Sequence, residues 1–262
     1  MERLEVLCVT MHQTDFRKLE EMRISSDVVF ANQADVTAFQ EHSFGAFTAK
    51  MVTTQTRGVG INRNLARIYA TGDILLFADD DLCYAPDYRE QVLSAFRKWP
   101  KADMVIFSVE FTRNGEVYRR RINKDGRIRM RSGLRYGAAS CAIRRSSLER
   151  RNLWFSTLFG GGTGYGHGED TEFLASAFRR GLRIYTSSYC LGQTASDSSS
   201  WFHGYDEQYF YDQGVLYHTI FGALAIPMAA QYCLRKRKRF ASQMPPKRAF
   251  STMLRGIRGK QH

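Results

Sequence analysis

The sequence contains few cysteines and no apparent export signal. Its five cysteines are scattered, at Cys8, Cys83, Cys141, Cys190 and Cys233, and no C-x-x-C pair occurs. This spacing excludes a disulfide framework and a cysteine zinc site, and it predicts reduced thiols in a cytosolic protein. The first residues, MERLEVLCVT, include two acids and no long apolar run, so we expect no secretory signal.

Negative charge is absent from the C-terminal part of the chain. Residues 235–262 contain ten Lys/Arg and no Asp/Glu, whereas residues 1–234 contain 28 basic and 26 acidic residues. Residues 213–234 contain neither acids nor Lys/Arg. A polybasic segment after an apolar one is typical of attachment to an anionic membrane surface, although a basic tail can also bind nucleic acid.

The remaining composition predicts a folded α/β protein. With 44% hydrophobic and 13% aromatic residues, a chain of 262 residues can bury a large core. Hydrophobic patterning predicts strands at 3–10, 26–32, 49–56, 73–78 and 103–111, and helices at 12–23, 60–70 and 86–98. This alternation predicts a mostly parallel central sheet with helices on both faces. Residues 117–145 predict a β-hairpin around Asp125-Gly126.

Three adjacent carboxylates, Asp79, Asp80 and Asp81, follow the apolar strand at 73–78. Ligand sites in parallel α/β sheets lie beyond the carboxyl ends of the strands. Carboxylate oxygens suit Mg²⁺ or Mn²⁺, which bind one or two acids together with substrate phosphate oxygens. The alternative is a turn that precedes a helix beginning at Pro86. The buried character of the strand favours the metal.

A second acidic pair, Glu169-Asp170, begins a predicted helix. Asp170 shares a helical face with the apolar Phe173, Leu174 and Ala177, so its carboxylate should point toward the protein or a cleft. A partly desolvated carboxylate suits a general base. Acids are also favoured at any helix start by the dipole. Six glycines within residues 160–168 favour a functional loop over that simpler explanation.

Taken in order, these segments resemble the family 2 glycosyltransferases of the GT-A fold. The resemblance spans roughly residues 3–180 and is carried by the first strand with Thr10, by RGVGINRNLARIYATGDILLFADDD and by GGGTGYGHGEDTEF. In this family a D-x-D motif ends a strand of the nucleotide-sugar domain, an R-G-x-x-x-x-R-N-x-A segment precedes it, and a glycine-rich loop with E-D lies at the acceptor side. The usual acid after the second strand is replaced here by Asn32-Gln33.

The resemblance implies a role for each matching residue. Asp81, with Asp79, would hold Mn²⁺ or Mg²⁺ on the diphosphate, and Asp79 or Asp80 would contact the ribose. The residues expected to line the nucleotide pocket are Thr10, Asn32 and Arg63. In the Glu169-Asp170 pair, Asp170 would deprotonate the acceptor hydroxyl, which gives inversion at the anomeric carbon. A downstream histidine, His203 or alternatively His167, is a candidate extra metal or phosphate ligand.

The sequence therefore predicts an inverting, metal-dependent glycosyltransferase. The expected donor is a nucleotide-diphospho-sugar, with a UDP-sugar preferred, and the expected acceptor is a saccharide or lipid-linked saccharide of bacterial-type surface polysaccharide or glycolipid biosynthesis. We expect a catalytic domain at 1–212, divided into a nucleotide-sugar half (1–111) and an acceptor half (112–212). An apolar helix and basic tail at 213–262 would follow. Residues 213–234 could dock on a membrane, pack on the domain or span the bilayer, and we expect a cytoplasmic protein, peripheral at the inner face of the membrane.

Two other functions are open. A nucleotidyltransferase with an acidic metal site would be expected to have a glycine- and lysine-rich phosphate loop after its first strand, and VTMHQTDF lacks one. A non-enzymatic basic module that binds nucleic acid through its tail would not need Asp81 or Asp170. We expect no nucleic-acid partner.

Overall fold

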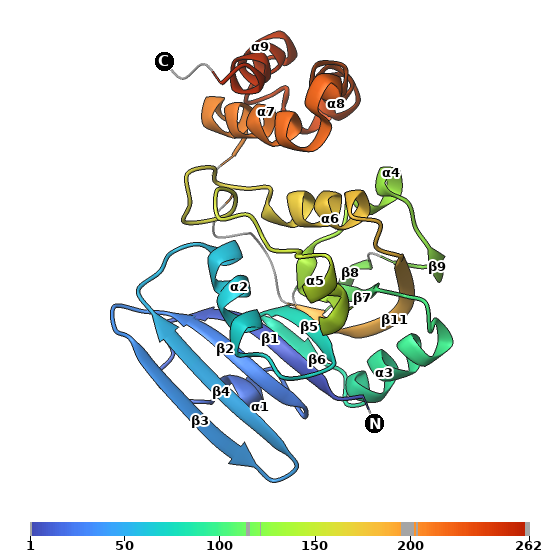
Figure 1. Ribbon diagram of the computed structural model, residues 1–262. Helices are drawn as coiled ribbons and strands as arrows, with labels where there is room; N and C mark the ends of the chain where they lie inside the picture. Colours follow the sequence, from blue (N-terminus) through green and yellow to red (C-terminus); the bar gives the residue numbers. More distant parts are fainter. Residues whose placement is uncertain (1, 114–115, 121, 195–201, 203, 260–262) are drawn as a thin grey trace.

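The computed structural model describes residues 2–113, 116–120, 122–194, 202 and 204–259, and it has a mixed α/β fold (Figure 1). The strands are β1 (Leu4–Met11), β2 (Asp27–Gln33), β3 (Ala38–Phe44), β4 (Phe47–Thr54), β5 (Ile74–Asp79), β6 (Leu82–Tyr84), β7 (Met104–Arg113), β8 (Glu116–Arg120), β9 (Gly126–Arg127), β10 (Cys141–Arg144) and β11 (Ile184–Thr194). The α-helices are α1 (Lys18–Glu21), α2 (Val59–Tyr69), α3 (Tyr88–Lys98), α4 (Met130–Gly133), α5 (Arg145–Arg150), α6 (Glu169–Arg179), α7 (Glu207–Phe221), α8 (Ala225–Phe240) and α9 (Pro246–Ile257). Two 3₁₀ turns, η1 (Ala138–Ser140) and η2 (Gly222–Leu224), complete the described elements.

The central sheet has the order β3-β4-β2-β1-β5-β10-β7-β11-β6. Strands β4, β2, β1 and β5 are parallel, β10 runs antiparallel to both of its neighbours, and β7 and β11 are parallel to each other. The predicted α/β class is therefore confirmed, but the sheet is mixed rather than mostly parallel. Thr10 pairs with Asn32, and Val9 pairs with Asp79, so the carboxyl ends of β1, β2 and β5 meet at one edge.

Both faces of the sheet are covered by helices. On one face β1, β2 and β5 pack against α1 and α3, with Met22, Val92 and Phe96 fully or nearly fully buried. On the other face they pack against α2 and α6, through Ala66 and Phe173. The near-continuous burial of β5 explains its uniformly apolar sequence, because a strand covered on both faces has no solvent-facing side.

Two local predictions were wrong, and one strand was missed. The helix expected at 12–23 is reduced to α1, and the Asp15 carboxylate accepts the N–H of Arg17, a local bond that competes with helix formation. The edge strand β3 was missed because every residue in it is exposed and no core pattern marks it. The hairpin around Asp125-Gly126 does not form. Instead β8 pairs with β7 and β9 with β11, where Ser188 donates to Asp125.

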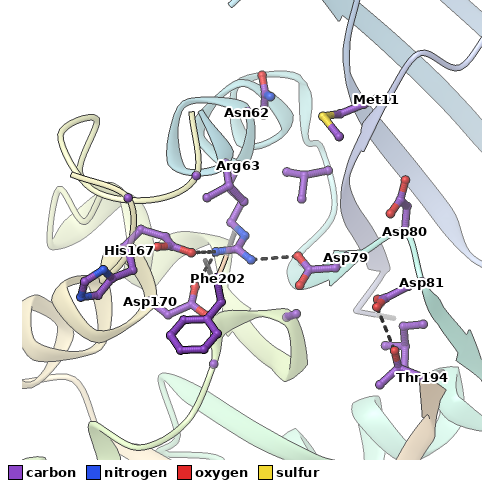
Figure 2. Close-up of a pocket in the computed structure, with 18 of the residues that line it drawn as sticks. Met11, Asn62, Arg63, Asp79, Asp80, Asp81, His167, Asp170, Thr194 and Phe202 are labelled. Atoms are coloured by element: carbon purple, nitrogen blue, oxygen red, sulfur yellow. Dashed lines mark hydrogen bonds and ion pairs between the residues drawn. The ribbon is translucent and has the colours of Figure 1, made fainter. Parts of the chain in front are cut away.

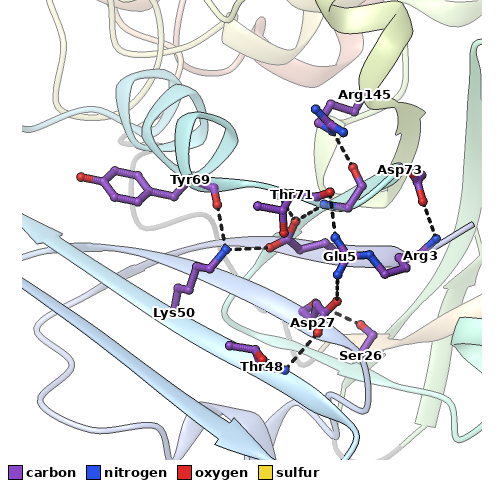
Figure 3. A network of polar contacts seen from close by, with 11 residues as sticks. Arg3, Glu5, Ser26, Asp27, Thr48, Lys50, Tyr69, Thr71, Asp73 and Arg145 are labelled. Carbon is purple, nitrogen blue, oxygen red and sulfur yellow. Dashed lines mark hydrogen bonds and ion pairs between the residues drawn. The ribbon is translucent and has the colours of Figure 1, made fainter.

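A buried carboxylate fixes α2 and β5 relative to β1 (Figure 3). Glu5 is 1% exposed and accepts the N–H groups of Thr71 and Gly72, both at 2.6 Å. Lys50 lies 3.9 Å from Glu5 and donates to the carbonyl of Tyr69, the last residue of α2. These bonds hold the connection between α2 and β5 in place, and both elements carry residues of the pocket described below.

Helices α7, α8 and α9 form a separate layer beside α6, with a small core of their own (Figure 1). The expected domain boundary between residues 212 and 213 falls inside α7. Gly222, with φ 53°, ends α7, so the apolar stretch at 213–234 is divided between two helices. By length and composition the segment Glu207–Phe240 could cross a membrane. Its most apolar 18-residue window has mean hydropathy 1.2, and 33% of that window is buried inside the protein.

Candidate active site

A pocket of about 640 Å³ lies at the edge where β1, β2 and β5 end (Figure 2). Its walls come from α2, the glycine-rich loop at 160–168 and α7. Seven carboxylates and one arginine line it among the described residues: Asp79, Asp80, Asp81, Glu169, Asp170, Asp206, Asp212 and Arg63. The pocket thus combines the two acidic clusters that are far apart in the sequence, and its charge is strongly negative.

Arg63 joins the two acidic clusters. Its side chain is 2% exposed, and it donates to Asp79 Oδ1 at 2.9 Å and to Asp170 Oδ1 at 2.5 Å. Helix α2 brings the guanidinium over the ring of Phe155, 5.2 Å away. A buried arginine is stable only when its charge is paired, so this contact holds the end of β5 and the start of α6 at a set separation.

The three adjacent aspartates point in different directions (Figure 2). Asp79 faces Arg63, Asp80 accepts a hydrogen bond from Thr10 Oγ1, and Asp81 accepts one from Thr194 Oγ1 at 2.9 Å. Among the described residues, no group of three or more His, Cys, Asp or Glu side chains has the arrangement of a metal site. A cation here would need ligands from a bound molecule in addition to the aspartates.

The acidic pair at the start of α6 faces the same space. Gly168 precedes the helix with φ 110°, a left-handed conformation that glycine adopts without strain. Burial, together with the neighbouring Asp170 carboxylate, raises the pKa of Glu169 to about 7. Asp170 is instead paired with Arg63. The two adjacent acids therefore have different electrostatic environments.

The structure places most, but not all, of the predicted nucleotide-pocket residues in the pocket. Thr10 and Arg63 line it, whereas Asn32 is fully buried beneath it, where its amide donates to the carbonyl of Gln13 and to Thr53 Oγ1. The adjacent Gln33 lines the pocket instead, because successive strand residues face opposite sides. His203 lies outside the described residues, and His167 lines the pocket.

Sequence reasoning missed the wall that α7 contributes. Tyr209 and Asp212 of α7 line the pocket, as do Asp206 and Phe202 just before this helix. One signal could have indicated Asp212: this acid directly precedes a stretch without charge, where a carboxylate buried with its apolar neighbours needs a hydrogen-bond partner. The C-terminal layer is therefore part of the pocket.

Comparison with known proteins agrees with this geometry. Residues 39–153 match the model of the family described as Glycosyl transferase family 2. The fold is similar to that of S. aureus TarS residues 1–349 in complex with UDP-GlcNAc, with TM-score 0.67 and 13% identity over 97% of this chain and 81% of that one. The complex of the same fragment with UDP gives TM-score 0.65 and 14% identity, again over 97% and 81%.

A longer TarS structure from S. aureus gives TM-score 0.62 and 14% identity over 92% of this chain and 44% of that one. No curated protein sequence matches the chain significantly. The fold is therefore that of the GT-A class, and the pocket lies at the carboxyl ends of its strands. Residues 39–153, which include Arg63 and the three adjacent aspartates, are thus similar to the family 2 glycosyltransferases.

Proposed function

We propose that the protein transfers a sugar from a UDP-sugar to an acceptor hydroxyl with inversion, and that Asp170 is the general base. The observation that carries this proposal is the Arg63 bridge, which holds Asp170 and Asp79 on either side of one guanidinium. A donor phosphate site and an acceptor base must lie within one sugar ring of each other for in-line attack. The bridge gives that proximity to the two acidic clusters.

The pocket and the comparisons support a nucleotide-sugar donor. The pocket lies beyond the carboxyl ends of parallel strands, the usual ligand position in such sheets. The S. aureus TarS fragment of similar fold was solved with UDP-GlcNAc and with UDP. We therefore infer a UDP-sugar for this chain.

The charge of the pocket supports a divalent cation. Seven carboxylates against one arginine would repel a diphosphate unless a cation came with it. Asp81 and Asp79 are the residues that would hold Mn²⁺ or Mg²⁺, since both ions bind one or two carboxylates together with phosphate oxygens. When bound, the ion would neutralise charge on the departing nucleoside diphosphate.

Asp170 would accept the proton of the acceptor hydroxyl. Arg63 stabilises negative charge on this carboxylate, and the first turn of α6 directs it into the pocket. One carboxylate that activates one nucleophile is sufficient for a single displacement, and a single displacement inverts the anomeric centre. Glu169 lies next to it, and burial together with the Asp170 charge raises the pKa of Glu169 to about 7.

We infer a saccharide or lipid-linked saccharide acceptor, used in surface polysaccharide or glycolipid synthesis at the cytoplasmic face of a membrane. The exposed surface of η2 and α8 supports this location. Leu224, Ile226 and Leu234 are 64%, 44% and 69% exposed, and the five basic residues at 235–239 are all exposed. Apolar side chains next to a polybasic run fit an anionic bilayer surface.

A donor screen tests the proposal. UDP-, GDP-, CMP- and dTDP-sugars would be compared for thermal stabilisation with Mn²⁺, in the parent, in Asp81→Asn and in the control Glu149→Gln on the exposed face of α5. We expect Mn²⁺-dependent stabilisation by a UDP-sugar, lost in Asp81→Asn and kept in the control. Stabilisation that survives in Asp81→Asn would exclude the metal assignment.

The base is tested separately. Asp170→Asn should bind the donor found in the screen within about twofold of the parent. It should lose transfer by about 100-fold or more, because general base catalysis contributes on that order. Turnover retained in Asp170→Asn would rule out its role.

A further inference from the structure

Three consecutive residues of the glycine-rich loop contact one face of α7. The N–H of Gly166 donates to Asp212 Oδ2 at 2.8 Å. His167 Nε2 lies 3.1 Å from Gln213 Oε1, and its ring stacks on Tyr209 with centroids 4.5 Å apart. A β-carbon at Gly168 would lie 2.6 Å from the side chain of Leu216. The α7 residues in these contacts are Tyr209, Asp212, Gln213 and Leu216, which share a helical face.

Asp212 is the polar centre of this contact. The residue is 2% exposed, and its second oxygen accepts the side-chain amide of Gln208 at 2.6 Å. One carboxylate oxygen is therefore used by the loop and the other by its own helix. Burying a carboxylate costs free energy unless both of its oxygens accept hydrogen bonds. The hydrogen bond from Gly166 therefore lowers the cost of burying Asp212.

The contact lies directly before the proposed base. Gly168 is the residue that precedes α6, and Glu169 and Asp170 are the first two residues of that helix. A shift of the backbone at 166–168 would move the first turn of α6 and, with it, the carboxylate of Asp170. Misplacing a reacting group by about 1 Å can cost on the order of 100-fold in rate.

We propose that Asp212 is a positioning residue for Asp170, and that the C-terminal helices are part of the catalytic unit rather than an appended tail. The proposal rests on the role of Asp170 given above. It adds that α7 helps the loop to hold the base. Asp212 accepts the N–H of Gly166, and Tyr209 stacks on His167. Leu216 packs against Gly168.

The test compares Asp212→Ala with Asp212→Asn. Asparagine keeps an oxygen that accepts the Gly166 N–H, and its NH₂ group can donate to Gln208 Oε1 once the side-chain amide of Gln208 turns over, whereas alanine removes both contacts. Glu207→Gln, an exposed acid at the first turn of α7 that pairs with Arg248, is the matched control. Three quantities would be measured in the full-length chain: hydrogen exchange over residues 158–168, UDP affinity with Mn²⁺, and kcat for UDP release from the donor identified by the screen.

In Asp212→Ala we expect loop exchange to rise about tenfold and kcat to fall at least about tenfold, with UDP affinity within twofold of the parent. In Asp212→Asn and Glu207→Gln, loop exchange, UDP affinity and kcat should all stay within about threefold of the parent. Unchanged loop exchange in Asp212→Ala would overturn the proposal. So would a loss in Asp212→Asn as large as that in Asp212→Ala, because the charge itself would then be acting on the substrate.

A parallel measurement on Asp170→Asn separates the two proposals. If that variant retains kcat while Asp212→Ala loosens the loop, the base assignment fails, and so does positioning of Asp170. If Asp170→Asn is inactive and Asp212→Ala behaves like the parent, only the positioning role fails. Loop exchange does not depend on turnover, so it reports on the contact in either case.

Discussion

At the scale of single residues, the site depends on one buried arginine between carboxylates of both acidic clusters. Arg63 is the pocket's one arginine among the described residues, and its Nε has no hydrogen-bond partner among them. Lysine could not replace it, because one ammonium cannot present the planar fork that reaches Asp79 and Asp170 together. Glu169 lies farther from the guanidinium, at 4.0 Å, than Asp79 and Asp170 do.

Stability should therefore depend on the protonation of Glu169. Burial and the Asp170 charge raise its pKa from 4.5 to about 7, so folding favours the protonated form. The stabilisation is fully present below the unfolded-state pKa and is lost as the pH rises through about 7. Glutamine stays neutral at every pH. The difference in melting temperature between Glu169→Gln and the parent should therefore increase by about 4 °C from pH 5 to pH 8.5.

Differential scanning calorimetry without nucleotide would measure this difference, with Glu149→Gln as the control that should show no such trend. A relative melting temperature of Glu169→Gln that is flat or falls with pH would contradict the assignment of the raised pKa to Glu169.

At the scale of elements, two glycines allow α7 and α9 to approach closely. A β-carbon at Gly214 would lie 2.2 Å from the carbonyl oxygen of Met253, and one at Gly256 would lie 2.2 Å from that of Tyr211. Because these neighbours are backbone atoms, no side-chain movement can make room. The contact keeps α7 against α9 while its opposite face reaches the glycine-rich loop.

Gly256→Ala should consequently destabilise the C-terminal layer. The strain of separating the helices, about 2–3 kcal/mol because the clashing atoms belong to the backbone, exceeds the gain in helix propensity of about 1 kcal/mol. Chemical denaturation should show a net loss of roughly 1–2 kcal/mol. Ser251→Ala on the exposed face of α9 should be nearly neutral, and a Gly256→Ala protein as stable as the parent would refute the close approach.

At the scale of the whole molecule, the C-terminal layer presents two surfaces of different chemical character. One face of α7 lines the pocket, and the exposed side of α8 carries the apolar and basic residues proposed to contact lipid. Helix α8 contains no acid, so its field is of one sign. A membrane bound there would place the active site at a defined side of the bilayer surface.

Vesicle flotation tests this surface. Vesicles with anionic phosphatidylglycerol should carry the protein upward, and purely zwitterionic vesicles should not. Replacing Arg235, Lys236 and Arg237 by Gln should weaken binding by about 3 kcal/mol, since each basic residue near such a surface contributes about 1 kcal/mol. The control is Gln231→Ser, on the exposed side of α8. Cys233 is not used because it is buried and its substitution would disturb the core. Duplex DNA binding by the parent, with no vesicle binding, would favour the nucleic-acid alternative.

Sequence patterns were sufficient where local chemistry decides structure. The apolar run 73–78 and the amphipathic pattern of 60–70 each predicted an element that the structure contains, and the acids at 79–81 and 169–170 line one pocket. These patterns failed where the position of a residue depends on a segment that is distant in the sequence. Asn32 is turned away from the pocket by strand pairing, and β3 exists only because β4 offers an edge to pair with.

The sequence by itself thus determined the α/β class, the two acidic clusters and the basic C-terminus, because hydrophobic period, residue chemistry and charge are local properties. Only the tertiary structure decided that Arg63 bridges the clusters and that α7 closes the pocket against the glycine-rich loop. These contacts join residues such as Arg63 and Asp170, 107 positions apart. Their existence depends on how the sheet order and helix packing bring distant segments together, which no local pattern specifies.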